Sequence, residues 1–199
     1  PAATVLGRTL AAFHRVPTVA RVVITVPRDH RERFQPFVEN APVPSELVDG
    51  GATRQESVRL ALERLAADEG PDLVVAIHDG ARCFVNPAVI AAAIDSAAEH
   101  GAVTVAVPAV DSIKRVDEEL RVRESLRREE LWQVQTPQVF RLGVLLGAHD
   151  RCRHEDPAGY EHSTDDASLV ERYHPVRVVP GERSNLKLTT PEDYAYARY

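Results

Sequence analysis

The 199-residue sequence contains no methionine, two lysines, one tryptophan and two cysteines. The two cysteines, Cys83 and Cys152, exclude a multi-disulfide scaffold. One disulfide between them is an alternative, but a reduced cytoplasmic protein is the simpler interpretation. No stretch approaches the roughly 20 apolar residues that a membrane-spanning helix needs. The opening residues lack the basic flank of a secretory signal, so we expect no leader there.

The charge balance is also informative. A net charge of −6 at pH 7 gives no bulk attraction to nucleic acid, so we expect no nucleic-acid partner. Nearly all basic side chains are arginine, which makes Lys114 and Lys187 stand out. A lysine retained against this bias suggests a role for a compact ammonium group. Because position 1 is not methionine, we expect the natural start to lie upstream.

Short β-branched runs alternate along the chain with longer amphipathic stretches. We expect strands at 21–26, 46–48, 73–77, 103–107 and 176–179. We expect helices at 4–15, 28–38, 53–67, 87–99, 142–151, 165–173 and 191–198. The strands are almost entirely apolar, which is typical of a sheet covered on both faces. This alternation predicts a single α/β domain over residues 1–199, with a mostly parallel sheet between helices.

Residues 111–135 interrupt the alternation. They hold many charges and two short β-like pieces, at 113–116 and 120–122. We expect a β-arm that stands off the sheet and can embrace a second subunit.

Polar residues follow the predicted strands, where ligands gather in open α/β sheets. Asp79 and Arg82 come after the strand at 73–77. The carboxylate can hold a divalent cation, and the arginine can meet a phosphate or fix the carboxylate. A local ion pair in a turn explains both residues equally well.

A glycine-containing segment, Asp49–Ser57, precedes the helix at 53–67. Its two glycines allow the backbone to approach a flat ligand such as a base. Thr53 and Glu56 have the spacing of a capping box. A capped helix after a glycine turn is also an adequate explanation.

Three further features of the sequence give weaker indications. Thr164 or Asp165 can cap a helix whose N-terminus attracts anions, although capping alone is the favoured explanation. Lys187 lies in a segment that we expect to be a short strand. The histidines near residues 149–166 match no zinc spacing, and we expect a solvated polar loop there.

Five motifs occur in order along nearly the whole chain. They are Asp49-Gly-Gly-Ala-Thr-Arg-Gln-Glu-Ser57, His78-Asp-Gly-Ala-Arg82, Trp132-Gln-Val-Gln-Thr-Pro-Gln138, Thr164-Asp-Asp-Ala-Ser168 and Asn185-Leu-Lys-Leu-Thr-Thr-Pro-Glu-Asp193. Each is modest alone, but together the set resembles the 2-C-methyl-D-erythritol 4-phosphate cytidylyltransferases of non-mevalonate isoprenoid biosynthesis.

The resemblance implies a three-layer, Rossmann-like nucleotidyltransferase fold with a protruding arm. It also implies Mg²⁺ as cofactor, a homodimer joined through the arm, and transfer of CMP from CTP to the sugar-alcohol phosphate with release of pyrophosphate. The acceptor phosphate attacks the α-phosphorus of CTP in line, so the protein positions two anions and offsets developing charge. Ribitol phosphate as acceptor, or a non-catalytic relative that binds nucleotide, are the alternatives.

The resemblance also assigns residues to the nucleotide. Gly51 and Ser57 match positions that contact the cytosine, while Ala52 replaces a residue that is often polar in the family. Lys187 matches the lysine that grips the α-phosphate. Asp79 matches the carboxylate near the metal and the substrate, so Lys187 and Asp79 are the expected catalytic pair.

Four more residues match positions near the acceptor. Arg82 is the neighbour of the metal carboxylate, and Ser112 stands at the base of the arm, where the family commonly has threonine. Arg128 matches an arm residue that reaches the acceptor across the dimer interface. Thr164 matches a threonine that contacts the phosphate of the same acceptor.

The sequence departs from the family in one large respect. The family begins with a strand and a glycine-rich loop whose arginine and lysine wrap the triphosphate. Here no Gly-x-Gly run is present, and no lysine precedes Lys114. We expect that strand and loop to be absent from these residues.

Overall fold

The computed structural model describes residues 4–197. The strands are β1 (Val22–Val26), β2 (Ser45–Asp49), β3 (Val74–Ile77), β4 (Ala102–Pro108), β5 (Lys114–Val116), β6 (Val122–Ser125), β7 (Trp132–Arg141) and β8 (Arg177–Pro180). The α-helices are α1 (Val5–Phe13), α2 (Arg31–Phe34), α3 (Pro36–Glu39), α4 (Arg54–Ala66), α5 (Pro87–His100), α6 (Leu142–Glu155), α7 (Pro157–Glu161), α8 (Asp166–Val170) and α9 (Pro191–Tyr196). Two 3₁₀ turns, η1 (Arg28–His30) and η2 (Arg128–Glu130), complete the elements.

The main sheet has the order β3-β7-β4-β8. Strand β7 is antiparallel to both β3 and β4, whereas β8 is parallel to β4, so three strands share one direction and β7 opposes them. Strands β1 and β2 form a separate parallel pair. The predicted α/β fold with mostly parallel strands is confirmed, with one reversed strand in the middle of the sheet.

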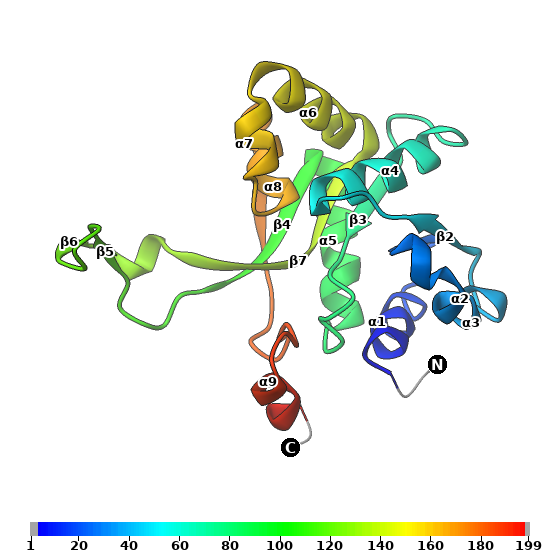
Figure 1. Ribbon diagram of the computed structural model, residues 1–199, viewed down its shortest axis with the longest axis horizontal. Coiled ribbons are helices and arrows are strands. Elements are labelled where there is room, and N and C mark those ends of the chain that lie inside the picture. Colours follow the sequence, from blue (N-terminus) through cyan, green and yellow to red (C-terminus); the bar gives the residue numbers. More distant parts are fainter. Residues whose placement is uncertain (1–3, 198–199) are drawn as a thin grey trace.

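Helices cover both faces of the sheet, which gives three layers (Figure 1). On one face, α5 packs Ala93 and Ala97 against Val103 and Val139. On the other face, α4, α6 and α8 enclose a core that includes Phe140. Because successive strand residues point to opposite faces, adjacent residues of β7 enter different layers of the core.

The central strand β7 has no counterpart among the predicted strands, although it is the longest in the protein. Its sequence contains Pro137, and proline lacks the N–H that a sheet ladder uses. It also carries glutamine and threonine where a buried strand usually carries apolar side chains. Tertiary partners for those polar groups, described below, overcome the local signal.

Other expectations also need correction. The helix predicted at 28–38 is broken into η1, α2 and α3, and Pro36 begins the last of these. The segment around Lys187 is a loop rather than a strand, and α7 was not predicted. The predicted solvated loop is wrong for His149, which is buried in α6.

The predicted arm is present. Strands β5 and β6 form a hairpin at its tip, and the extended ends of β4 and β7 connect it to the body (Figure 1). Apolar side chains are exposed along it, with Leu120 81% and Val122 60% accessible.

A cavity of about 760 Å³ separates the pair β1-β2 from the main sheet. Residues of β1 and β3 line it together with side chains of α1 and α4. Neither strand has a second partner among residues 4–197, so one edge of each is unpaired.

No helix in the described part of the chain is long and apolar enough to cross a membrane. Both cysteines are buried and free.

Candidate active site

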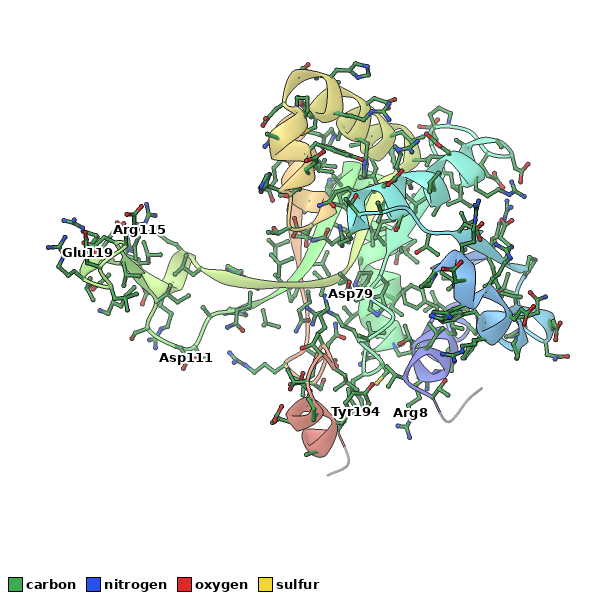
Figure 2. All side chains as sticks on the ribbon, in the orientation of Figure 1. Arg8, Asp79, Asp111, Arg115, Glu119 and Tyr194 are labelled. Atoms are coloured by element: carbon green, nitrogen blue, oxygen red, sulfur yellow. The ribbon has the colours of Figure 1, made fainter. Side chains whose placement is uncertain are left out.

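The loop after β3 and the loop after β8 meet at one end of the sheet. There Lys187 Nζ lies 3.2 Å from Asp79 Oδ2, although 108 residues separate them in the chain. A backbone hydrogen bond from Leu188 N–H to Ala81 C=O, 3.0 Å long, ties the two loops together. Figure 2 shows Asp79 beside the C-terminal segment, far from the arm tip. The two residues of the expected catalytic pair therefore lie in contact.

The Arg82 side chain contacts both of these loops. Its Nε lies 3.3 Å from Asp79 Oδ2, and its Nη1 donates to the Asn185 carbonyl at 2.8 Å. The side chain is mostly buried, at 14% exposure, whereas Lys187 is 47% exposed. Arg82 therefore orients the carboxylate, and the half-exposed ammonium of Lys187 is the group that can contact a phosphate.

His78 and Thr136 fix the backbone of the Asp79 loop. Asp79 N–H donates to Thr136 Oγ1 at 3.1 Å, and Thr136 Oγ1 lies 3.0 Å from His78 Nδ1. His78 Nε2 lies 3.1 Å from the Arg82 carbonyl, an acceptor only, so Nε2 carries the proton and Nδ1 accepts from Thr136. Burial lowers the pKa of His78 to about 4, which keeps the ring neutral.

The Lys187 loop is anchored by buried amides. Asn185 Nδ2 donates to the Thr136 carbonyl at 2.9 Å, and Gln135 Nε2 donates to the Glu182 carbonyl at 2.9 Å. Gly181 lets the chain pass close to β7, because a Cβ there would lie 2.5 Å from Gln135 Oε1. These contacts explain why a long loop delivers Lys187 to one place.

The glycine segment forms a compact loop before α4. Ser57 Oγ accepts from Gly51 N–H at 3.0 Å and donates to the Thr53 carbonyl at 2.9 Å. Thr53 caps α4 as predicted, by accepting from Glu56 N–H at 3.1 Å. The Glu56 carboxylate instead takes the Ala52 N–H at 2.8 Å, so the reciprocal half of the predicted capping box is wrong by one residue.

Gln138, on β7, organises the loop that holds Thr164. Its Oε1 accepts from the backbone N–H of Asp166 and of Ala167, each at 3.0 Å, and its Nε2 donates to Asp165 Oδ2 at 2.9 Å. Asp165 is the N-cap of α8, as one of the two predicted alternatives. Thr164 is exposed beside it.

The arm residues do not join this group within one chain. Ser112 is exposed at the start of the arm. Arg128, in η2, donates to the Val110 carbonyl at 3.1 Å. Figure 2 places Arg115 and Glu119 at the arm tip, well away from Asp79.

The donor set at Asp79 fits a hard divalent cation that is shared with a phosphate. No group of three or more acidic, histidine or cysteine side chains within residues 4–197 could hold a metal ion by itself. Mg²⁺ commonly uses one or two carboxylates and takes its other ligands from water and substrate phosphates. Asp79, 21% exposed, suits that role.

A profile of the 2-C-methyl-D-erythritol 4-phosphate cytidylyltransferase family matches residues 1–199. The chain belongs to this family.

Members with that name lie close in sequence. The cytidylyltransferase of Geobacillus kaustophilus is 41% identical over 193 residues, which cover 96% of this chain and 81% of that protein. That of Bacillus velezensis is 40% identical over 199 residues, with 98% and 82% covered.

Solved structures of cytidylyltransferases share the fold. The Thermus thermophilus enzyme superimposes with a TM-score of 0.76 at 34% identity, covering 98% of this chain and 86% of that chain. The 4-diphosphocytidyl-2C-methyl-D-erythritol synthase of Anaerococcus prevotii gives a TM-score of 0.86 at 27% identity, covering 98% and 84%. The predicted Rossmann-like nucleotidyltransferase fold is confirmed.

Sequence reasoning missed the residues that hold the cytidylyltransferase site together. His78, Arg54, Thr136, Gln138 and Asn185 all lie inside the five motifs, but their roles depend on partners from distant segments. Buried polar side chains in otherwise apolar elements were the available signal, because such groups need hydrogen-bond partners.

The neutral state of His78 predicts a pH dependence of stability. The folded pKa is about 4 and the ordinary value is 6.5, so the unfolded chain binds more protons between these values. Stability is full above pH 6.5 and falls by about 3 kcal/mol as the pH drops towards 4. Chemical unfolding across pH 4–7 measures it.

His78→Gln should flatten the profile across that interval. The exposed His30→Gln is the matched control and should keep the wild-type slope. An unchanged slope in His78→Gln would show that other groups cause the loss.

Proposed function

We propose that this chain transfers the cytidylyl group of CTP to 2-C-methyl-D-erythritol 4-phosphate and releases pyrophosphate. Family membership supports the reaction, and the contact between Lys187 and Asp79 supports this location for it. An ammonium and a carboxylate that meet at one sheet edge can bind a phosphate and a phosphate-bound cation side by side.

The chemistry follows from positioning rather than from a covalent intermediate. Lys187 offsets negative charge on the α-phosphate as the acceptor oxygen attacks, and Arg82 keeps the Asp79 carboxylate aimed at the same point. We assign Gly51 and Ser57 to the cytosine and Thr164 to the acceptor phosphate. Their two loops adjoin each other, which supports this assignment.

Mg²⁺ is the proposed cofactor, with Asp79 as its protein ligand. When bound, it neutralises phosphate charge and orients the triphosphate. The cytoplasm is the proposed compartment, and the two free cysteines agree with it.

The arm supports a proposed homodimer. It presents exposed apolar side chains on a projecting hairpin, and projections of this kind gain stability by burying that surface against a second copy. Arg128 and Ser112 lie on this arm, where the Arg128 side chain donates to the Val110 carbonyl. We place them in the site of the partner subunit.

We infer from the cavity between β1 and β3 that one additional strand fits there and precedes a phosphate-binding loop. Val22 N–H donates to Pro44 C=O, so alternation turns the peptide groups of Val23 and Thr25 away from β2. Leu142 N–H donates to Leu73 C=O, so those of Val74 and Ala76 turn away from β7. Both unpaired edges border the cavity.

An apolar, β-branched segment that runs parallel to β1 would pair with both edges. Its carboxyl end would then emerge beside the loops of Gly51 and Asp79. A glycine-rich loop with an arginine and a lysine, which the family resemblance implies, would begin there. The cytidylyltransferases reported above contain residues without a counterpart in this chain, since it covers about four-fifths of their length.

Acceptor-dependent pyrophosphate release tests the function. With CTP and Mg²⁺, we expect release with 2-C-methyl-D-erythritol 4-phosphate and little with ribitol 5-phosphate or erythritol 4-phosphate. Nucleotide binding without release for any acceptor would instead favour a non-catalytic relative.

Lys187→Ala should lower kcat by about 100- to 1,000-fold, the usual effect of removing one preorganised charge-stabilising donor. Lys114→Ala is the matched control, since Lys114 lies on the arm and donates to Ser125 Oγ. Near-normal turnover in Lys187→Ala would remove Lys187 from the site.

Subunit mixing tests the arm. Arg128→Ala and Lys187→Ala should each be inactive, yet a re-paired mixture should recover about a quarter of wild-type activity. Half of its dimers are mixed, and each mixed dimer has one intact site. No recovery, with dimers present by analytical ultracentrifugation, would place Arg128 and Lys187 in the same chain's site.

Fusing a Val/Ile-rich strand and a glycine-rich Arg/Lys loop to the N-terminus tests the cavity. We expect Tm to rise by several degrees and CTP to bind at least about tenfold tighter. A matched fusion with proline in the middle of the strand cannot complete the ladder and should gain neither. Equal gains from both fusions would contradict insertion.

A further inference from the structure

An ion pair that is buried at its acidic end joins the loop assigned to the nucleotide to the loop assigned to the acceptor, and its Arg54 side chain is 34% exposed. Arg54 is the first residue of α4, directly after its N-cap Thr53, and Asp166 is the first residue of α8, directly after Thr164 and Asp165. Arg54 Nη2 lies 2.6 Å from Asp166 Oδ2, across 112 residues of sequence. The Asp166 side chain is fully buried.

A second contact reinforces the first. The Gln55 side chain, also buried, donates from Nε2 to the Ser163 carbonyl. Two consecutive residues of α4 thus hold the two ends of the segment Ser163–Asp166. Gln138 fixes the same segment from the sheet, as described above.

The surrounding charges keep both Asp166 and Arg54 ionised. Burial opposes the charge on Asp166, but His149 and Arg54 outweigh that effect and hold the pKa of Asp166 below its usual value. His149 Nε2 lies 3.7 Å from Asp166 Oδ1, and both side chains are fully buried. A buried charge that loses its partner is strongly destabilising, so the pair resists separation.

The charge on Arg54 also interacts favourably with the catalytic carboxylate of Asp79. Burial opposes its charge, but the Asp166 carboxylate and the more distant Asp79 and Asp165 raise the pKa of Arg54. Its Nη1 is buried without a hydrogen-bond partner among residues 4–197. A planar guanidinium carries its donors on separate nitrogens, so Nη2 can bind Asp166 while Nη1 stays available to another acceptor.

We propose that Arg54 is a positioning residue, which through Asp166 sets the distance between the nucleotide loop (Gly51–Ser57) and the acceptor loop (Ser163–Asp165). This inference rests on the proposed function. In-line transfer needs both substrates in register, and a misplacement of about 1 Å can lower the rate about 100-fold. The two loops precede different helices, α4 and α8, and the ion pair between Arg54 and Asp166 connects them directly.

Hydrogen exchange tests the link without turnover. In the full chain, Arg54→Gln should speed exchange in residues 163–168 by about tenfold or more, while β4 and α5 keep wild-type protection. CTP with Mg²⁺ should protect both loops in the wild type but only residues 50–57 in Arg54→Gln. Arg59→Gln, which removes another α4 arginine paired with Glu63, is the matched control and should behave as wild type.

Kinetics tests the consequence. Arg54→Gln should lower kcat about 100-fold and leave KM for CTP within about threefold, with partial recovery in Arg54→Lys. Unchanged exchange and kcat in Arg54→Gln would overturn the proposal. If Arg54→Gln does not fold, Arg54→Lys and Asp166→Asn decide it by the same readouts. A wild-type chain without turnover would contradict the proposed function, and the exchange experiment would still decide the link.

Discussion

The contact between Lys187 and Asp79 depends on a strand that belongs to neither loop. Thr136, on β7, accepts the Asp79 N–H through its hydroxyl and the Asn185 side chain through its carbonyl. One residue of the central strand therefore positions both sides of the site. Strand β7 pairs with β3 and β4 after Thr136 and with β4 again before it, so this reference point lies between two paired stretches of the sheet.

The same strand extends its control to the acceptor loop. Gln138 uses all its hydrogen-bonding groups on Thr104, Asp165 and the first amides of α8. A buried amide is costly unless it is satisfied, and here that requirement fixes α8 against the sheet. Buried polar groups of β7 thus position the loops of Asp79, Asn185 and Asp165 from inside an apolar core.

The arm and the cavity beside β1 and β3 are less completely packed than this region. The arm exposes apolar side chains that a compact domain would bury, and the cavity leaves two strand edges without partners among the described residues. Under the proposed function, a second subunit covers the first feature and an extended segment fills the second. The arm and the pair β1-β2 lie on opposite sides of the main sheet (Figure 1).

The sequence by itself determined the apolar strands, the longer helices, the arm and the motif residues of the family, because these depend on local periodicity and on residue type. It did not reveal β7, whose proline and glutamines oppose a central strand locally. It also left Arg54, Thr136 and Asn185 without roles. Only the tertiary structure decided these, since a buried polar side chain is stable or costly according to partners that lie far away in the chain.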